Sequence, residues 1–281
     1  MNVALIVNAD DYGHTPGVSQ GIRESHLRGI VTSTTAMMNM PGVDEALQKA
    51  VQECPRLGLG VHLVLTTGAP LLPASQVYSI ITGDNSFPDE SDLIQRLSML
   101  DLDEVRMEWR AQIERFLSVT GRPPDHLDSH HHISFLSPGL FQVMLELAQK
   151  FECAIRFPTG EAAIDMMSDF PTEVAKECLE RNLHLVAQYK PCHPDHFLKS
   201  FYGENSTRAA LFEILENLSA GTTEIMCHPG YVDEALIKHS VYQQPRQVEL
   251  SILTDPETME FVKTRNIELI NFKDLSFQTV R

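Results

Sequence analysis

The sequence has few basic residues and no paired cysteine motif, and both features narrow the range of functions. Lysine and arginine number 22 against 38 aspartates and glutamates, which gives a formal net charge of −16. Such a chain repels phosphate backbones and anionic lipid, because it has no basic stripe to replace their counterions. The five cysteines form an odd set without a CxxC pair, which argues against a disulfide framework or a thiolate zinc site. We expect neither nucleic acid nor membrane as a partner, and a reducing, cytoplasmic setting.

Long hydrophobic runs are missing as well. No stretch of the ~18 residues that a membrane helix needs is continuously apolar. The N-terminal segment MNVALIVNADDYG has a short apolar run with no basic flank before it and two aspartates after it. This pattern is typical of a buried strand rather than a signal peptide. The sequence therefore predicts a soluble protein that is not exported.

Short apolar runs alternate with longer segments of helical period, which is typical of repeated βα units over a parallel sheet. Eight strands are predicted, at residues 2–8, 32–39, 57–65, 125–133, 153–158, 183–189, 223–228 and 267–272. Seven helices are predicted between them, at residues 17–29, 43–54, 102–121, 137–151, 171–182, 205–218 and 255–266. Eight parallel strands are the number that closes a β/α barrel. The fold class is therefore α/β, with a TIM-like barrel as the expected architecture.

One domain is expected over residues 1–281, since no repeat, low-complexity tract or break in composition marks a boundary. A barrel of this kind often uses roughly 200 to 250 or more residues in a single unit. The stretch 66–101 contains several glycines and prolines but little periodicity, which predicts an extended loop. Loops of this length on a barrel often shape a substrate cleft.

Ionisable residues follow the predicted strands. They are Asp10 and Asp11 after the first, His62 near the end of the third, DSHHH (128–132) at the end of the fourth, Arg156 at the end of the fifth and His228 at the end of the seventh. The C-terminal ends of barrel strands open on one face, so these side chains should converge although they are distant in sequence.

The histidine-rich segment DHLDSHHHI contains candidates for a metal ligand and for a residue that orients this ligand. Side chains at i and i+2 of a strand face the same way, so Asp128, His130 and His132 should share one side. Whether His130 or His132 is the ligand stays open at this level. Alone, three consecutive histidines could also be a solvated loop.

One carboxylate and two neutral imidazoles leave open positions on a divalent cation, as a hydrolytic metal centre requires. Asp11, His62 and His130 suit this role. Successive residues of a strand point apart, so Asp10 could instead take a proton from bound water. The simpler alternatives are a turn at NADD, where Asn and Asp bond to their own backbone, and a hydrogen-bonded barrel histidine at His62.

With these residues the sequence resembles the YdjC-like carbohydrate deacetylases. The matching segments are IVNADDYGHTPGVSQGI, GIVTSTTAMMN, LGLGVHLVLTTGAPL, HLDSHHHI, SFYGE, EIMCHPGYVDEAL and ILTDPETMEFVKTRNIEL, which together cover nearly the whole chain. The resemblance implies a distorted TIM-like β/α barrel and a bound divalent cation, usually magnesium. It also implies a homodimer and removal of acetyl groups from short N-acetylglucosamine-containing sugars such as chitobiose or its phosphate.

The resemblance also implies roles for individual residues. Carried over by position, His62, His130 and Asp11 are the metal ligands and Asp10 is the catalytic base. By analogy with more distant polysaccharide deacetylases, an arginine that holds the base and a late histidine that acts as acid correspond to Arg156 and His228. The spaced HxxxH ligand pair of that distant group is absent here.

The remaining expectations concern support, substrate and metal. Asp128 and His132 are the candidates for supporting the metal ligands. Sugars stack on aromatic rings, and the aromatic candidates near the matching motifs are Tyr12, Phe197, Tyr202 and Tyr231. Two imidazoles and one carboxylate suit Zn²⁺, Mn²⁺ or Co²⁺ at least as well as Mg²⁺. The alternative functions are cleavage of a phosphorylated disaccharide, with Lys199 and Arg246 as further cations, and a non-catalytic sugar-binding barrel.

Overall fold

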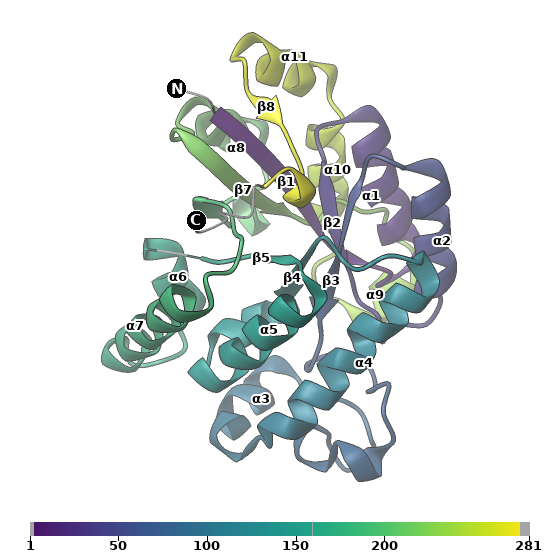
Figure 1. Cartoon of the computed structure of the whole chain (residues 1–281). Helices are drawn as coiled ribbons and strands as arrows, with labels where there is room; N and C mark the ends of the chain where they lie inside the picture. Colours follow the sequence, from purple (N-terminus) through teal and green to yellow (C-terminus); the bar gives the residue numbers. More distant parts are fainter. Residues whose placement is uncertain (1–2, 159, 276–281) are drawn as a thin grey trace.

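The computed structural model describes residues 3–158 and 160–275, and a parallel sheet with helices around it forms its centre (Figure 1). Asn2, the first residue of the first predicted strand, lies outside the described residues. The strands are β1 (Val3–Tyr12), β2 (Ser33–Ala36), β3 (Gly58–Leu63), β4 (His126–Ser129), β5 (Ala154–Ile155), β6 (His196–Leu198), β7 (Gly221–Cys227) and β8 (Glu268–Leu269). Their order is β5-β4-β3-β2-β1-β7-β6, with β8 paired to β1 beside this path.

Eleven α-helices lie in the part of the chain that is described. They are α1 (Pro16–Arg28), α2 (Val43–Glu53), α3 (Glu90–Arg96), α4 (Leu102–Thr120), α5 (Pro138–Phe151), α6 (Gly160–Met166), α7 (Thr172–Tyr189), α8 (Arg208–Glu216), α9 (Glu234–His239), α10 (Gln244–Leu253) and α11 (Pro256–Thr264). Ser137 and Asp255 cap α5 and α11, and proline follows each cap. This arrangement satisfies a free backbone N–H where proline is tolerated.

The predicted α/β class with a parallel sheet is confirmed, and the barrel is distorted. Every strand pairing in the described sheet is parallel. β5 and β6 stand at the two ends of the strand order, and the backbone N–H of Ile155 donates to the carbonyl of Cys192 at 2.9 Å across this gap. The sheet therefore curls toward a barrel without a full ladder between its end strands.

The strand predicted at 183–189 is wrong. These residues form the C-terminal part of α7, and the sixth strand is instead the short β6 at His196–Leu198. No glycine or proline separates 183–189 from the predicted helix 171–182, so the helix continues until Lys190 adopts a left-handed conformation (φ 48°). Leu185, Val186 and Tyr189 of the run are partly buried against the core, Leu183 is exposed, and the helix packs on α5.

The segment 66–101 is irregular but not devoid of structure. It contains α3 and three short 3₁₀ turns. Its start is fixed by Glu108 of α4, whose buried carboxylate accepts the backbone N–H groups of Leu71 and Leu72 at 3.0 Å. The helices α6, α9 and α10 were also missed from the sequence, and α10 later contributes to the site.

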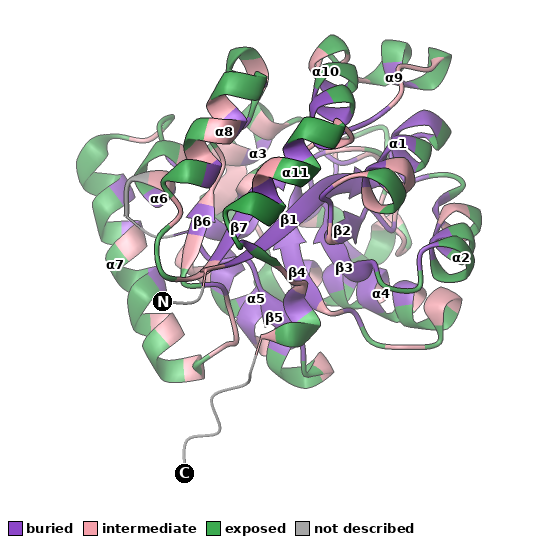
Figure 2. Ribbon diagram, turned by 90° about the horizontal axis from the view of Figure 1, so that it is seen from above, coloured by how far each residue is buried: buried purple, intermediate pink, exposed green. Residues whose placement is uncertain are grey.

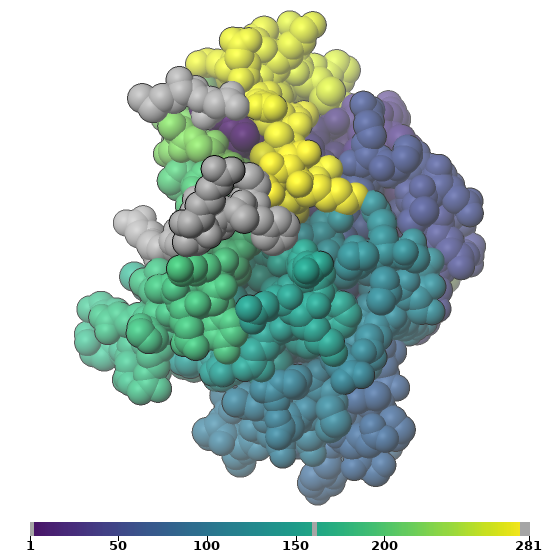
Figure 3. Space-filling model, in the orientation of Figure 1, coloured from purple at the N-terminus to yellow at the C-terminus, as the bar shows by residue number. Residues whose placement is uncertain are grey.

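The strands β2 to β5 are buried throughout and β1 and β7 over most of their length, whereas the outer faces of the helices are exposed (Figure 2). β8 pairs with the N-terminal half of β1, and in the space-filling view the yellow residues near the end of the described chain lie beside the visible purple part of β1 (Figure 3). Among the described helices, none is both long and apolar enough to cross a membrane. The buried sheet thus forms a rigid base for the side chains at its C-terminal edge.

Candidate metal centre

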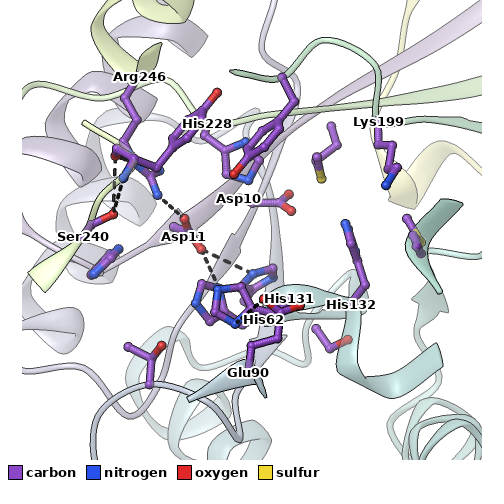
Figure 4. A pocket seen from close by; sticks show the side chains of 18 of the residues that line it. Asp10, Asp11, His62, Glu90, His131, His132, Lys199, His228, Ser240 and Arg246 are labelled. Atoms are coloured by element: carbon purple, nitrogen blue, oxygen red, sulfur yellow. Dashed lines mark hydrogen bonds and ion pairs between the residues drawn. The ribbon is translucent and has the colours of Figure 1, made fainter. Parts of the chain in front are cut away.

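A cavity of about 1060 Å³ opens at the C-terminal ends of the strands. Asp10 and Asp11 from β1, His62 from β3 and His228 after β7 all line it, as Figure 4 shows. Arg246 enters the same cavity from α10. The predicted convergence of side chains from separate strands is therefore present in the structure.

Asp11, His62 and His130 form a compact group. Asp11 Oδ1 lies 3.4 Å from His62 Nε2 and 3.1 Å from His130 Nδ1. One donor atom from each of the three residues lies within 4.8 Å of the other two. This spacing allows one carboxylate oxygen and two imidazole nitrogens to contact a single ion.

The backbone at the end of β1 lets both adjacent aspartates face the cavity. The strand register is irregular between Ala9 and Tyr12, and Asp11 has a φ of 71°. A left-handed residue interrupts the alternation of side chains along a strand. Asp11 therefore turns toward the histidines, whereas Asp10 points toward Arg156.

Asp128 supports His62 from behind. Its Oδ1 lies 2.6 Å from His62 Nδ1, and its Oδ2 accepts a hydrogen bond from Thr35 Oγ1 at 3.0 Å. Since a carboxylate can only accept, Nδ1 of His62 carries a proton, which leaves Nε2 as the atom available to a metal ion once its own proton is released. This is the arrangement expected of a metal-binding histidine.

The electrostatics of this group fit a cation. Burial lowers the pKa of His62, but the surrounding carboxylates, Asp128 first, outweigh it and raise this pKa to about 10. Asp11 Oδ1 is buried and accepts no well-formed hydrogen bond from the described residues. A site that attracts a proton so strongly, around an unsatisfied carboxylate oxygen, is suited to a divalent metal ion.

Asp10 is held by a buried arginine. The two terminal nitrogens of Arg156 donate to the two carboxylate oxygens of Asp10, each at 2.7 Å. Asn8, two residues earlier on the same face of β1, donates to Asp10 Oδ1 at 2.8 Å. Burial raises the pKa of Asp10, but the charge and hydrogen bonds of Arg156 outweigh it and keep this pKa well below its usual value. Asp10 is therefore ionised and fixed in direction.

Arg156 is fully buried and contacts two further acids. Its Nε donates to Glu224 Oε1 at 2.8 Å, and Nη1 lies 3.0 Å from Asp128 Oδ2. Burial raises the pKa of Glu224 to about 7, with Arg156 opposing the shift. Because one cation serves three carboxyl groups, a proton or a further cation is needed to balance the site.

His228 is held through its backbone. Its N–H donates a short hydrogen bond to Glu249 of α10, and its Nδ1 is buried without a partner among the described residues. Burial lowers the pKa of His228 to about 4, although Asp10 and Asp11 oppose the shift. The imidazole ring of His228 is therefore neutral at neutral pH.

Two of the four predicted aromatic residues line the cavity, Phe197 and Tyr202. The ring of Tyr202 stacks on Tyr242 with centroids 4.5 Å apart. Tyr12 and Tyr231 are placed elsewhere: Tyr12 is 0% exposed and donates to the Ala46 carbonyl, and Tyr231 donates to Glu24. The prediction that Tyr12 and Tyr231 contact substrate is therefore not supported by their positions.

The strand predicted at 125–133 ends at Ser129, and His130 begins a 3₁₀ turn. His131 and His132 have φ values of 52° and 54°, so the alternation that would place Asp128, His130 and His132 on one side does not hold. The ring of His132 packs against Phe197 in a T-shaped arrangement with centroids 6.2 Å apart, and His132 lies apart from Asp11 and His62 (Figure 4). It does not support a ligand as predicted.

Sequence reasoning missed Glu224, Tyr242 and Glu249. Glu224 is a single charged residue inside the apolar run of β7, and a lone buried charge is a signal that could have identified it. Tyr242 and Glu249 belong to a region where no helix was predicted. Glu249 Oε1 accepts the hydroxyl of Tyr242 at 2.6 Å, which ties the aromatic pair to His228.

Comparison with known proteins agrees with this site. The YdjC-like protein family model matches residues 4–264. A carbohydrate deacetylase of Enterococcus faecalis is 36% identical over 280 residues, covering 98% of this chain and 99% of that protein. A chitooligosaccharide deacetylase of Salmonella paratyphi B is 33% identical, covering 98% and 100%.

Among solved structures, a protein of Enterococcus faecalis described as a "putative cellobiose-phosphate cleavage protein" has a TM-score of 0.84 and 36% identity. The alignment covers 97% of this chain and 98% of that one. The family match spans residues 4–264 and therefore the positions of all the site residues described above. This chain belongs to the YdjC-like protein family.

Proposed function

We propose that this protein is a metal-dependent hydrolase that removes the N-acetyl group from short sugars containing N-acetylglucosamine and releases acetate. The observation that carries the proposal is the group of Asp11, His62 and His130 next to the Asp10–Arg156 pair in one cavity. A cation site beside a fixed, ionised carboxylate supplies the two requirements of amide hydrolysis by water. The names of the relatives support a carbohydrate substrate.

Asp11, His62 and His130 would hold the ion, which when bound lowers the pKa of water and polarises the amide carbonyl. Asp10 accepts the proton of the attacking water. Arg156 keeps Asp10 ionised and directs its oxygens, and Asp128 keeps His62 in the tautomer that leaves Nε2 free. The remaining proton must reach the nitrogen of the departing amine.

His228 is the proposed donor of that proton. Because the pKa of His228 is lowered to about 4, its ring is neutral at first and becomes the donor after it receives the proton that Asp10 takes from the attacking water. Asp10 and Asp11 favour the charged ring. A well-placed acid is typically worth about 10²–10⁴-fold in rate, because it avoids expulsion of a poor leaving group.

The cavity supports a substrate of at least one sugar ring. Tyr202 lines the cavity with an aromatic ring and is 46% exposed, whereas Phe197 is only 4% exposed and has the Arg156 guanidinium over its ring. Sugars bind by stacking their apolar faces on such rings and by hydrogen bonds from their hydroxyls. We therefore propose a short N-acetylated oligosaccharide such as chitobiose, or its phosphate.

The proposed metal is Mg²⁺ by family resemblance, with Zn²⁺, Mn²⁺ or Co²⁺ as alternatives. Two imidazole nitrogens and one carboxylate oxygen favour the latter three, since Mg²⁺ prefers oxygen ligands and water. Elemental analysis of protein purified without added metal would distinguish them.

The second candidate is cleavage of a phosphorylated disaccharide, which the description of the solved relative favours. Lys199 and Arg246 line the cavity. However, Lys199 pairs with Asp165 at 2.7 Å and Arg246 with Asp11 at 2.5 Å. Both cations are thus neutralised in part, which weakens the case for a phosphate site. A non-catalytic sugar-binding role is less supported still, because binding alone needs no carboxylate fixed beside a cation site.

The test is incubation with N,N′-diacetylchitobiose and with its phosphate ester, followed by mass spectrometry. Loss of an acetyl group with the glycosidic bond intact supports deacetylation. Release of monosaccharides would support cleavage instead. Turnover should stop with a chelator and return with added metal, and absence of any turnover would favour the binding protein. The resemblance also implies a homodimer, which light scattering would measure.

A further inference from the structure

Arg246 is the second buried arginine of the cavity, and its position points to a role in the metal site. It lies on α10 and is 3% exposed. Its Nη2 lies 2.5 Å from Asp11 Oδ2, its Nε donates to the Tyr242 carbonyl at 3.0 Å, and its guanidinium lies over the Tyr242 ring at 5.4 Å. These contacts fix the direction from which the guanidinium approaches Asp11.

The two oxygens of Asp11 consequently have different surroundings. Oδ1 faces the nitrogens of His62 and His130 and accepts no well-formed hydrogen bond from the described residues. Oδ2 is occupied by Arg246. Asp11 therefore has one oxygen left for a cation, whereas an unrestrained carboxylate can bind a metal through either one oxygen or both.

We propose that Arg246 is a positioning residue that reserves one oxygen of Asp11, so that a bound metal ion keeps a coordination position open for water or substrate. The inference rests on the proposed metal site. A catalytic metal centre needs such an open position, and a second carboxylate oxygen would compete for it.

The charge of Arg246 makes this role separable from a merely structural one. A guanidinium beside the site repels a cation and lowers its affinity. If Arg246 only held Asp11 in place, its removal would weaken metal binding. If it reserves an oxygen, its removal releases a second ligand atom and removes a like charge, so metal binding should stay equal or become tighter while turnover falls.

The experiment measures Mn²⁺ binding by calorimetry and turnover at saturating Mn²⁺ for the wild type, R246M and R246K. The control is R110M, which removes an arginine from an exposed pair with Glu114 on α4. For R246M we expect a Kd no higher than that of the wild type and a kcat reduced about tenfold or more. R246K keeps the charge and one donor, so it should recover part of the lost kcat. Co²⁺ in the site gives a direct readout, since its visible absorption weakens when ligands are added, as expected in R246M.

Two results would overturn the inference: a folded R246M that binds Mn²⁺ about tenfold more weakly, or one that keeps the wild-type kcat. If R246M lacks a cooperative thermal transition, R246K decides: reduced kcat with Kd within about threefold of the wild type supports the role, and about tenfold weaker binding contradicts it. Mn²⁺ binding needs no substrate. A wild type that binds Mn²⁺ but does not deacetylate would therefore contradict the proposed function, while the comparison of Kd values would still test Arg246.

Discussion

Arg156 and Asp10 form a two-point contact in which each carboxylate oxygen receives one terminal nitrogen of the guanidinium at 2.7 Å. The two residues are 146 positions apart in sequence and come from the ends of β1 and β5. Such a fork fixes the plane of the carboxylate as well as its charge. Asp10 thus has a defined direction before any substrate enters, which general base catalysis requires.

Asp10→Asn should therefore remove the base and leave the metal group intact. Asparagine has the shape of aspartate but cannot accept a proton at neutral pH, so we expect turnover to fall about 10²–10⁴-fold. Mn²⁺ affinity should change little, since Asp11, His62 and His130 are untouched. Initial rates of acetate release and calorimetry would measure the two quantities. A variant that retains a tenth or more of the activity would assign the base to another group.

His62→Ala should abolish high-affinity metal binding together with activity. The substitution removes one of the three donor atoms, and only Asp11 and His130 of the group remain to hold an ion. Metal content after gel filtration would be the measurement. If metal and activity both remain, His62 is not a ligand.

Asp128→Asn should weaken metal binding without removing a ligand. An asparagine at this place can present its amide N–H₂ to His62 Nδ1, and the ring would then lose the proton arrangement that leaves Nε2 free. Loss of such a supporting carboxylate typically costs about 10–100-fold in metal affinity or activity. The matched control is Asp84→Asn, at an exposed position within the segment 66–101. Unchanged Mn²⁺ affinity in the Asp128 variant would contradict the argument.

Tyr202→Ala should raise KM for a disaccharide more than it lowers kcat. The ring lines the cavity next to His228 and is backed by Tyr242, so its loss removes a stacking surface worth about 1 kcal/mol, or roughly fivefold in KM. Tyr231→Ala is the control, because Tyr231 does not line the cavity. Equal effects of the two substitutions would argue against a sugar subsite at Tyr202.

Much of the fold and the core of the site could be predicted from the sequence, and the failures have physical causes. Alternating βα periodicity predicted the parallel sheet, and placement at strand ends predicted the convergence of Asp10, Asp11, His62 and His228. The prediction of a strand at 183–189 failed because a short apolar run is compatible with a helix as well as with a strand. The expectation that His132 lies on the same side as Asp128 and His130 failed because His131 and His132 are both left-handed and break the alternation. From the sequence, Arg246 was considered only as a further cation for a phosphorylated substrate. Its contact with Asp11 spans 235 positions and leaves no local pattern in the sequence.

The buried His126 should make the free energy of unfolding depend on pH. The residue starts β4 at the opposite end of the strand from the site, is fully buried, and stacks on Phe272 with ring centroids 3.6 Å apart. Neither ring nitrogen has a hydrogen-bond partner among the described residues. Burial and the charge of Arg156 lower its pKa well below the ordinary value of 6.5. The folded state therefore keeps this ring neutral.

As pH falls below 6.5, the unfolded chain takes up a proton at His126 and the folded chain does not, so this residue destabilises the folded state increasingly in acid. The contribution approaches about 1.4 kcal/mol per pH unit. His126→Leu removes it while keeping an apolar side chain against Phe272. The free energy of unfolding from urea titrations should therefore fall less steeply between pH 6.5 and 5 in this variant than in the wild type. The same substitution at exposed His184 is the control, and parallel pH profiles for wild type and His126→Leu would show that the buried ring is protonated in the folded state.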